Sequence, residues 1–248
     1  AIWSMPPYEA KQMPLKFFLK FFQNHGLFNL KNRPQWYTIK NRSRTYVKKI
    51  LDTISGEYYK NYRINKISRL SNGVKVYYGG NNEFFDYDKV VIATHADEAL
   101  SLITDPTPEE KSILANFKYK NNIAIIHTDE TLMPKNKKAW SSWNSSVNKE
   151  NTSETSITYW LNLLQNLKTN KNIFLSLNPF LKIDPKKIIS KVKFTHPYYD
   201  KEALENQNRL KNIQNKKNLL FCGSYFGYGF HEDGIKSSLE MIKSFNDR

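Results

Sequence analysis

The segment from Leu219 to Ile242 constrains what this chain can fold into more than any other part of its sequence. An apolar run, Leu219–Cys222, ends at Gly223, a loop rich in glycine and aromatic residues follows, and a helix is expected to begin near Asp233–Gly234. Glycines let the backbone come close to a flat or anionic group, and the first turn of a helix offers unpaired N–H groups and a partial positive charge. The pattern therefore predicts a strand, a loop that approaches a ligand, and a helix that begins at that ligand.

The size and composition of the chain are those of a globular protein. Its 248 residues suit one large domain or two smaller ones, at roughly 100–200 residues each. The composition, 40% hydrophobic and 14% aromatic, is ample for a packed core. No apolar stretch approaches the roughly 18–20 residues of a membrane span. A single cysteine, Cys222, excludes a disulfide framework within the chain, so we expect a cytoplasmic protein.

The net charge of +15 raises the question of nucleic-acid binding. The lysines are scattered along the chain among many asparagines and isoleucines, and the runs Lys135–Lys138 and Lys216–Lys217 lie beside polar, turn-like residues. No helix-turn-helix, zinc or RNA-binding signature accompanies the charge. Nucleic acid is therefore not predicted as a partner, and a basic nucleic-acid module is an alternative that the charge alone supports.

Periodicity and turn residues predict the elements of the first half of the chain. A helix is expected over Leu15–Phe22 with Gly26 as its stop, and Ser43 is a candidate cap for a second helix that reaches Ile54. Three strand-like runs are then expected to form a β-meander, with turns at Ser71–Gly73 and Gly79–Asn82: Tyr62–Ile67, Gly73–Tyr78 and Lys89–Thr94.

The second half begins with a short helix over Thr107–Leu114, which has Pro108 at its first position. A turn or short helix is expected at Leu163–Leu167, and Asn144–Thr155 is the most loop-like stretch of the chain. Candidate strands are Ile123–His127, Trp140–Trp143, Ile157–Leu161 and Ile173–Leu177.

Two of these segments, Val90–His95 and Leu219–Ile242, together resemble the flavin-contacting parts of the FAD-dependent amine oxidase superfamily, and the chain looks closest to a bacterial branch of NAD/FAD-binding oxidoreductases. The resemblance extends over nearly the whole chain, although its specific motifs lie in these two segments. It implies an α/β fold in which an incomplete, glutathione-reductase-like FAD-binding domain is interleaved with a mixed-sheet substrate domain. Residues 1–55 and 99–189 would form the substrate domain, and residues 56–98 (a β-meander) and 190–248 the FAD-binding domain.

The resemblance also implies a set of FAD-binding residues. Ile64 takes the position whose backbone pairs with the adenine edge, and small residues near position 93 let the chain pass close to the dinucleotide. The backbone N–H groups at the start of the last helix would meet the N1–C2=O edge of the flavin, where reduction adds negative charge. The implied cofactor-binding residues are Ile64, Ala93, Thr94, Gly223, Ser224, Glu232, Asp233 and Gly234.

His231 is the candidate catalytic residue, because it falls where monoamine oxidases place an aromatic residue over the flavin. A histidine can also transfer a proton near neutral pH. The alternative is a histidine that only makes a hydrogen bond in a loop. In the predicted substrate domain the candidate substrate residues are Trp143, Asn144, Tyr159 and Trp160, with ordinary core packing as the alternative.

The sequence also departs from the superfamily pattern. Asn41–Arg42 stands where a Gly-Gly pair is common, and Asn122 stands where many members have a lysine. Oxidation of an amine by O₂ is therefore not implied. No G-x-G-x-x-G follows a strand, so the chain is interpreted as the C-terminal portion of a longer protein. The five histidines lack the spacing of a zinc site, and no metal is predicted.

The leading hypothesis is an FAD-dependent oxidoreductase in which a hydride passes from a substrate carbon to flavin N5, with this fragment inactive alone. The substrate would be a small molecule, and the resemblance allows a lipid-linked one. The alternative is a flavoprotein remnant without catalytic activity, which acts as an interaction module. The sequence leaves the substrate, the electron acceptor and the oligomeric state open.

Overall fold

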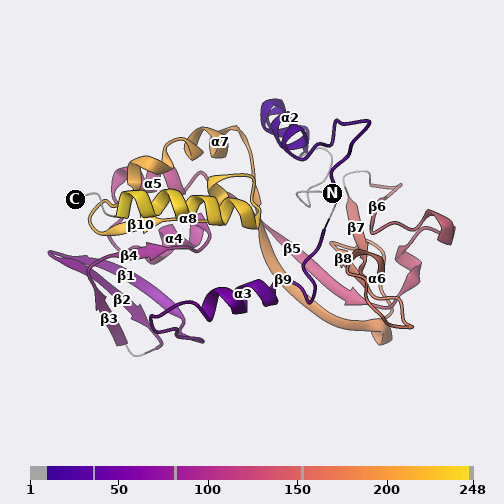
Figure 1. Ribbon diagram of the computed structural model, residues 1–248, viewed down its shortest axis with the longest axis horizontal. Helices are drawn as coiled ribbons and strands as arrows, with labels where there is room; N and C mark the ends of the chain where they lie inside the picture. Colours follow the sequence, from indigo (N-terminus) through magenta and orange to yellow (C-terminus); the bar gives the residue numbers. More distant parts are fainter. Residues whose placement is uncertain (1–9, 36, 81–82, 152–153, 246–248) are drawn as a thin grey trace. The chain divides into compact units, whose positions relative to one another are not determined.

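The computed structural model describes residues 10–35, 37–80, 83–151 and 154–245, and the chain divides into two compact units (Figure 1). Unit 1 consists of Ala1–Gly56 and Lys120–His196, and unit 2 of Glu57–Tyr119 and Pro197–Arg248. The first boundary lies between α3 (Arg44–Leu51) and β1 (Ile64–Leu70), and the other two fall inside long strands, β5 (Lys118–His127) and β9 (Ile188–Tyr198). The two units are therefore interleaved along the chain, and the predicted mixture of helices and sheets is confirmed.

Unit 1 is built on a five-stranded sheet in the order β6-β7-β8-β5-β9. Strand β7 pairs antiparallel with β6 and with β8, and β8 also pairs antiparallel with β5. The other elements in the described part of unit 1 are helices α2 and α3, a single turn α6, and short 3-10 helices. Their bounds are β6 (Trp143–Val147), β7 (Thr155–Trp160), β8 (Phe174–Leu177), α2 (Leu15–Asn24), α3 (Arg44–Leu51), α6 (Leu161–Leu164), η1 (Glu130–Leu132), η2 (Lys137–Ala139) and η3 (Pro185–Lys187).

The register of this sheet assigns its side chains to two faces, because neighbouring residues of a strand point to opposite sides. One face carries the cross-strand row Trp143, Tyr159, Leu175 and Ile126. The other face carries the row Asn144, Thr158, Ser176 and Ile125. The first face is partly open, whereas the polar members of the second row are buried.

His127 lies on the second face in a closed hydrogen-bond network. The residue is fully buried, its Nε2 lies 2.8 Å from the Ser176 hydroxyl, and its Nδ1 accepts the backbone N–H of Asp129 at 3.1 Å. Ser176 Oγ is in turn 2.7 Å from Thr158 Oγ1. Burial lowers the pKa of His127, and the nearby Asp129 carboxylate opposes this effect only in part. The network therefore requires a neutral imidazole, because a protonated Nδ1 cannot accept the Asp129 N–H.

Folding stability is expected to fall as the pH drops below about 6.5, the ordinary pKa of histidine. Below that pH the unfolded chain binds a proton at His127 that the folded chain does not. The free energy of unfolding then falls by up to about 1.4 kcal/mol per pH unit, until the pH reaches the lowered pKa of the folded protein. Urea unfolding at pH 7 and pH 5 measures this loss, which His127→Gln should reduce. An equal loss in the wild type and the variant would contradict the assignment.

The described part of unit 2 contains an antiparallel meander, a two-stranded parallel sheet and several helices (Figure 1). Buried apolar residues from the meander, the parallel sheet and the helices form one continuous core, which includes Ile67, Ile92 and Phe221. The bounds are β1 (Ile64–Leu70), β2 (Gly73–Tyr78), β3 (Glu83–Tyr87), β4 (Val90–Ile92), β10 (Leu219–Phe221), α4 (Ala96–Leu102), α5 (Pro108–Leu114), α7 (Lys201–Gln207), α8 (His231–Phe245), η4 (Leu210–Ile213) and η5 (Ser224–Phe226).

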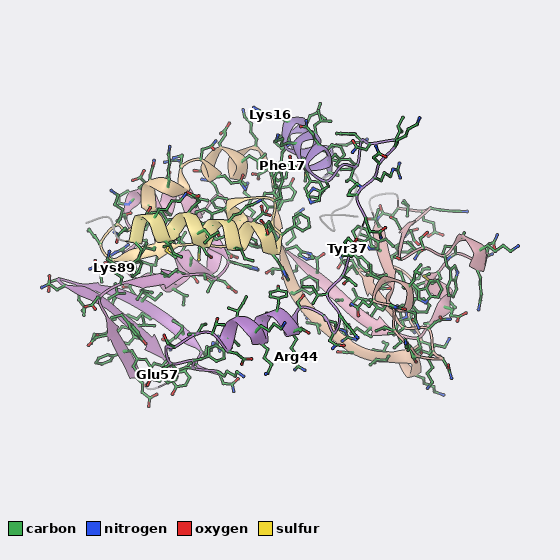
Figure 2. The ribbon with its side chains drawn as sticks, viewed as in Figure 1. Lys16, Phe17, Tyr37, Arg44, Glu57 and Lys89 are labelled. Carbon is green, nitrogen blue, oxygen red and sulfur yellow. The ribbon has the colours of Figure 1, made fainter. Side chains whose placement is uncertain are left out.

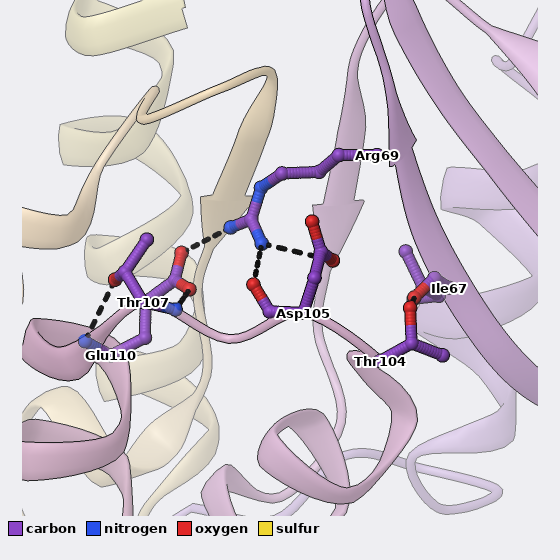
Figure 3. Close-up of polar contacts among 6 residues, drawn as sticks. All are labelled: Ile67, Arg69, Thr104, Asp105, Thr107 and Glu110. Carbon is purple, nitrogen blue, oxygen red and sulfur yellow. Dashed lines mark hydrogen bonds and ion pairs between the residues drawn. The ribbon is translucent and has the colours of Figure 1, made fainter.

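A buried ion pair connects the meander to helix α5 (Figure 3). The side chain of Arg69 on β1 is 5% exposed, and its guanidinium contacts both the fully buried Glu110 and Asp105. Glu110 and Thr107 form a capping box, in which the Glu110 carboxylate accepts the Thr107 N–H (2.8 Å) and the Thr107 hydroxyl accepts the Glu110 N–H (3.2 Å). One carboxylate thus caps the helix and neutralises the arginine. The predicted helix with Pro108 at its first position is confirmed.

Several predicted elements differ from the structure. The third strand of the meander is β3, which was not predicted, and Lys89–Thr94 does not belong to the meander because β4 pairs with β10 instead. The strand expected at Trp140–Trp143 begins only at Trp143, and β6 and β7 occupy both ends of the expected loop Asn144–Thr155. Helices α4 and α7 and strand β9 were also missed. Asn81 and Asn82, part of one predicted turn, lie outside the described residues.

The two compact units divide the chain differently from the predicted domains in two places. Residues 99–119 were assigned to the substrate domain, but they lie in unit 2, where Ile113, Leu114 and Phe117 join the core. Residues 190–196 lie in unit 1. Both differences arise because β5 and β9 pass from one unit into the other without a change in composition. No helix among the described residues is long and apolar enough to cross a membrane.

Candidate functional site

The two segments that carry the family resemblance lie side by side in unit 2. Strands β4 and β10 pair in parallel with Leu219 opposite Val90 and Phe221 opposite Ile92, and the Cys222 N–H continues the ladder to the Ile92 carbonyl at 3.2 Å. Because the strands are parallel, their carboxyl ends meet at one edge of the sheet, which is the usual place for a ligand in α/β proteins. The predicted strand, loop and helix of the C-terminal segment are confirmed.

The two outer edges of this small sheet differ. On β10, the side-chain amide of Gln214 pairs with both backbone groups of Phe221, donating to its carbonyl (2.9 Å) and accepting its N–H (3.0 Å). On β4, the N–H and C=O groups of Val90 and Ile92 point toward β10. The N–H and C=O groups of Val91 therefore point away from β10. Within the part of the chain that the structure describes, β4 pairs with no second strand. The sheet is therefore closed at β10 and open at β4.

A groove of about 330 Å³ lies beside the open edge of β4. Aliphatic residues of the meander and of β4 form most of its lining, and Ile64, Ala93 and Thr94 belong to it. Ile64 is 37% exposed, and Ala93 and Thr94 follow directly after β4. The structure thus brings these three predicted cofactor residues together at one surface.

Gly223 joins the end of β10 to this surface. Its φ of +154° suits glycine, and a Cβ atom there would lie 2.7 Å from the Tyr225 ring and 3.6 Å from the Thr94 carbonyl oxygen. Its N–H donates to the Ser237 hydroxyl of α8 at 2.9 Å. Gly223 is therefore next to Thr94, and it anchors α8 to the strand. Ser224 begins the short helix η5 that follows.

Helix α8 begins at His231, two residues before the predicted start. The Asp233 carboxylate accepts the Phe230 N–H at 2.9 Å, and the N–H groups of Asp233 and Gly234 donate to the Phe230 carbonyl. Asp233 is thus a capping residue, and Gly227 makes room for it, because a Cβ there would lie 2.3 Å from the carboxylate. The amides of Asp233 and Gly234 take part in the first turn of the helix, while Glu232 and His231 are exposed.

Lys89 and Gln207 hold the surroundings of this helix in place. The Lys89 ammonium donates to the Phe245 carbonyl at the end of α8 (2.6 Å), where a cation is favoured by the helix dipole (Figure 2). The Gln207 amide donates to the carbonyls of Tyr225 and Gly227 and so fixes the glycine-rich loop. Neither Gln207 nor Gln214 was identified from sequence, because no local pattern marks a glutamine that bridges distant backbone groups.

Gly234 is the one glycine of α8 and has open space beside it, since nothing lies within 4 Å of a Cβ built there. A glycine within a helix costs about 1 kcal/mol relative to alanine. The packing of the protein itself does not demand a glycine at this position. The space beside the first turn of α8 is therefore available to a ligand.

The four predicted substrate residues do not form one site in unit 1. Trp143 and Tyr159 face each other across β6 and β7, with ring centroids 5.6 Å apart. Asn144 and Trp160 lie on the opposite face and make internal contacts: the Asn144 amide bonds to the carbonyls of Ser141 and Thr158, and the Trp160 indole donates to Asn172. The structure thus gives Asn144 and Trp160 a place in the packing of unit 1.

No protein-family model matches this sequence, and no curated protein matches it. Three solved structures illustrate what the fold resembles. A fatty acid isomerase from P. acnes that produces CLA shares 12% identity and a TM-score of 0.58, covering 82% of this chain and 52% of that protein. A candidate protoporphyrinogen oxidase from Exiguobacterium sp. 255-15 shares 12% identity and a TM-score of 0.62, over 93% of this chain and 57% of that one. A putrescine oxidase bound to putrescine shares 8% identity and a TM-score of 0.56, over 84% and 54%.

The chain therefore shares the fold of these three solved enzymes, and the resemblance noted in its sequence is confirmed at the level of fold. At these identities the likeness establishes architecture and not activity. The chain spans little more than half the length of each of the three proteins.

Proposed function

We propose that unit 2 binds FAD and that the chain is part of an amine-oxidase-like flavoenzyme. The observation that carries the proposal is the unfilled space beside Gly234 in the first turn of α8, in a fold shared with FAD-dependent enzymes. The residues at the nearby strand ends fit such a ligand, because Ala93, Thr94 and Gly223 leave the backbone accessible.

The chain's own residues would bind and orient this cofactor. Ile64, Ala93 and Thr94 would contact the dinucleotide along the open edge of β4, and Gly223 and Ser224 would lie near its pyrophosphate. The positive end of α8, at Glu232, Asp233 and Gly234, would stabilise negative charge on the flavin. When bound, FAD supplies the hydride-accepting chemistry. His231 would hold or move a proton beside it, and Trp143 and Tyr159 on the open face of unit 1 would contact a small-molecule substrate.

The open edge of β4 supports a second candidate function, an interaction module. An unpaired strand edge beside an apolar groove is a ready template for a strand from another segment. In that case unit 2 would bind polypeptide at Val91 and would not need FAD. A folded protein that takes up no flavin would favour this candidate.

The proposed flavin site predicts opposite effects of Gly234→Ala on stability and on FAD binding. The flavin-free protein should gain up to about 1 kcal/mol from the better helix former. The added methyl group should weaken FAD binding, and Gly234→Gln should weaken it by at least about 10-fold, because each fills the space that the ligand needs. Thermal melting and FAD titration of the full gene product measure both effects. Gly80→Ala, which also meets nothing within 4 Å, is the control. Unchanged FAD affinity in Gly234→Gln would contradict the site.

A further inference from the structure

Unit 1 contains a groove that the flavin site does not use. Its volume is about 440 Å³, and it lies on the open face of the sheet, where Ile126, Leu175 and Tyr159 form a cross-strand row. Seven aliphatic side chains line the groove, and those on β5 and β8 that face it are only partly buried. A ligand in the groove would therefore meet a continuous aliphatic surface.

Arg42 is the only charged residue among the described residues that line this groove. It is exposed, and its guanidinium forms no hydrogen bond or ion pair with the described part of the chain. Its backbone has a φ of +69°, which is unfavourable for a residue other than glycine. The turn is held by the Arg42 N–H, which donates to the Ile39 carbonyl at 2.9 Å, and by the Thr45 N–H, which donates to the Arg42 carbonyl at 3.1 Å. A fixed backbone thus presents a cation without a counter-ion.

Gln165 adds a second polar group to the lining. Its Oε1 is buried and has no hydrogen-bond partner among the described residues. Buried amide groups are nearly always hydrogen-bonded, so this amide has bonding capacity that the chain does not use. The amide can be turned so that either its oxygen or its NH₂ faces a ligand.

We propose that the groove binds a molecule with an unbranched aliphatic chain and a carboxylate, in which the carboxylate pairs with Arg42 and the chain lies on the aliphatic lining. A guanidinium recognises a carboxylate through two parallel hydrogen bonds, and it repels an aliphatic ammonium ion. A carboxylate with a methylene chain therefore matches both the charge and the apolar surface of the groove. That this molecule is the substrate rests on the proposed function as a flavoenzyme. Binding of the molecule in the groove is independent of that proposal.

Calorimetric titration of the full gene product with laurate, below the concentration at which laurate aggregates, tests the proposal. Laurate should bind more tightly than octanoate, by roughly threefold to fourfold per methylene that is buried. Arg42→Gln should weaken laurate binding by about 10-fold and leave dodecanol binding unchanged. The matched control is Arg44→Gln, because Arg44 is the exposed first residue of α3 and does not line the groove (Figure 2).

Three results would overturn the proposal: no binding of laurate to the folded protein, equal losses in Arg42→Gln and Arg44→Gln, or binding of dodecylammonium as tight as that of laurate. The flavin spectrum separates this proposal from the proposed function. A protein that holds FAD and does not bind laurate contradicts the groove assignment alone. A protein that binds laurate through Arg42 and holds no FAD contradicts only the flavoenzyme.

Discussion

Arg69→Met is expected to lower the free energy of unfolding by about 3–5 kcal/mol. The reason is the buried carboxylate that the substitution leaves behind. Glu110 is fully buried, and the Arg69 guanidinium is the cation that it contacts (Figure 3). Removing one member of a buried ion pair costs more than the pair itself contributes, because the remaining charge stays in an apolar environment. Urea unfolding followed by circular dichroism measures the loss.

Two further variants identify the cause of this loss. Lys236→Met breaks an exposed pair with Glu232, in which both side chains are 68% exposed, and it should cost less than about 1 kcal/mol. The double variant Arg69→Met/Glu110→Met should recover part of the stability, because it removes both charges. A loss in Arg69→Met no larger than that in Lys236→Met would contradict the account of the buried pair.

Gly223→Ala is expected to destabilise the protein by about 2–5 kcal/mol, from the sum of backbone strain and overpacking. An alanine at φ +154° is strained, and its Cβ would lie 2.7 Å from the ring of Tyr225. Tyr225 is 2% exposed and packs in the core of unit 2, so moving its ring aside would disturb that packing. The same substitution at Gly80, where a Cβ meets nothing, should change the stability little. Urea unfolding of both variants compares the two sites, and equal stabilities would show that Gly223 is not constrained.

The parts of the fold that were predicted from sequence carry local signals. A helix start is indicated by Thr107, Pro108 and Glu110, and the structure has a capping box there. Gly26, predicted as a helix stop, follows α2 with a φ of +62°. Ser43 stands at the N-cap position of α3 as predicted, but its side chain makes no capping hydrogen bond, and the helix ends at Leu51. A cap can therefore be located from residue type even where its hydrogen bond does not form.

The parts that could not be predicted depend on contacts between distant residues. Trp143 and Asn144 were both predicted as substrate residues, but they are neighbours on β6, and a strand points neighbours to opposite faces. The pairing of β4 with β10 joins residues more than a hundred positions apart, so the same strand-like pattern was assigned to the meander. The edge closure by Gln214 and the buried pair of Arg69 with Glu110 are likewise visible only in the folded chain.

The proposed function depends on the residues that would bind the cofactor. Ile64, Ala93 and Thr94 lie together at one groove, and Gly223 lies next to Thr94. Their contact with FAD, the role of His231 and the identity of the substrate stay predictions.

The most direct test of the central claim is the visible absorbance spectrum of the full gene product, purified under native conditions and then mixed with FAD. We predict the bands of oxidised flavin, retained after removal of free FAD and reduced in Gly234→Gln. A folded, monodisperse protein that stays colourless after incubation with FAD would contradict the account.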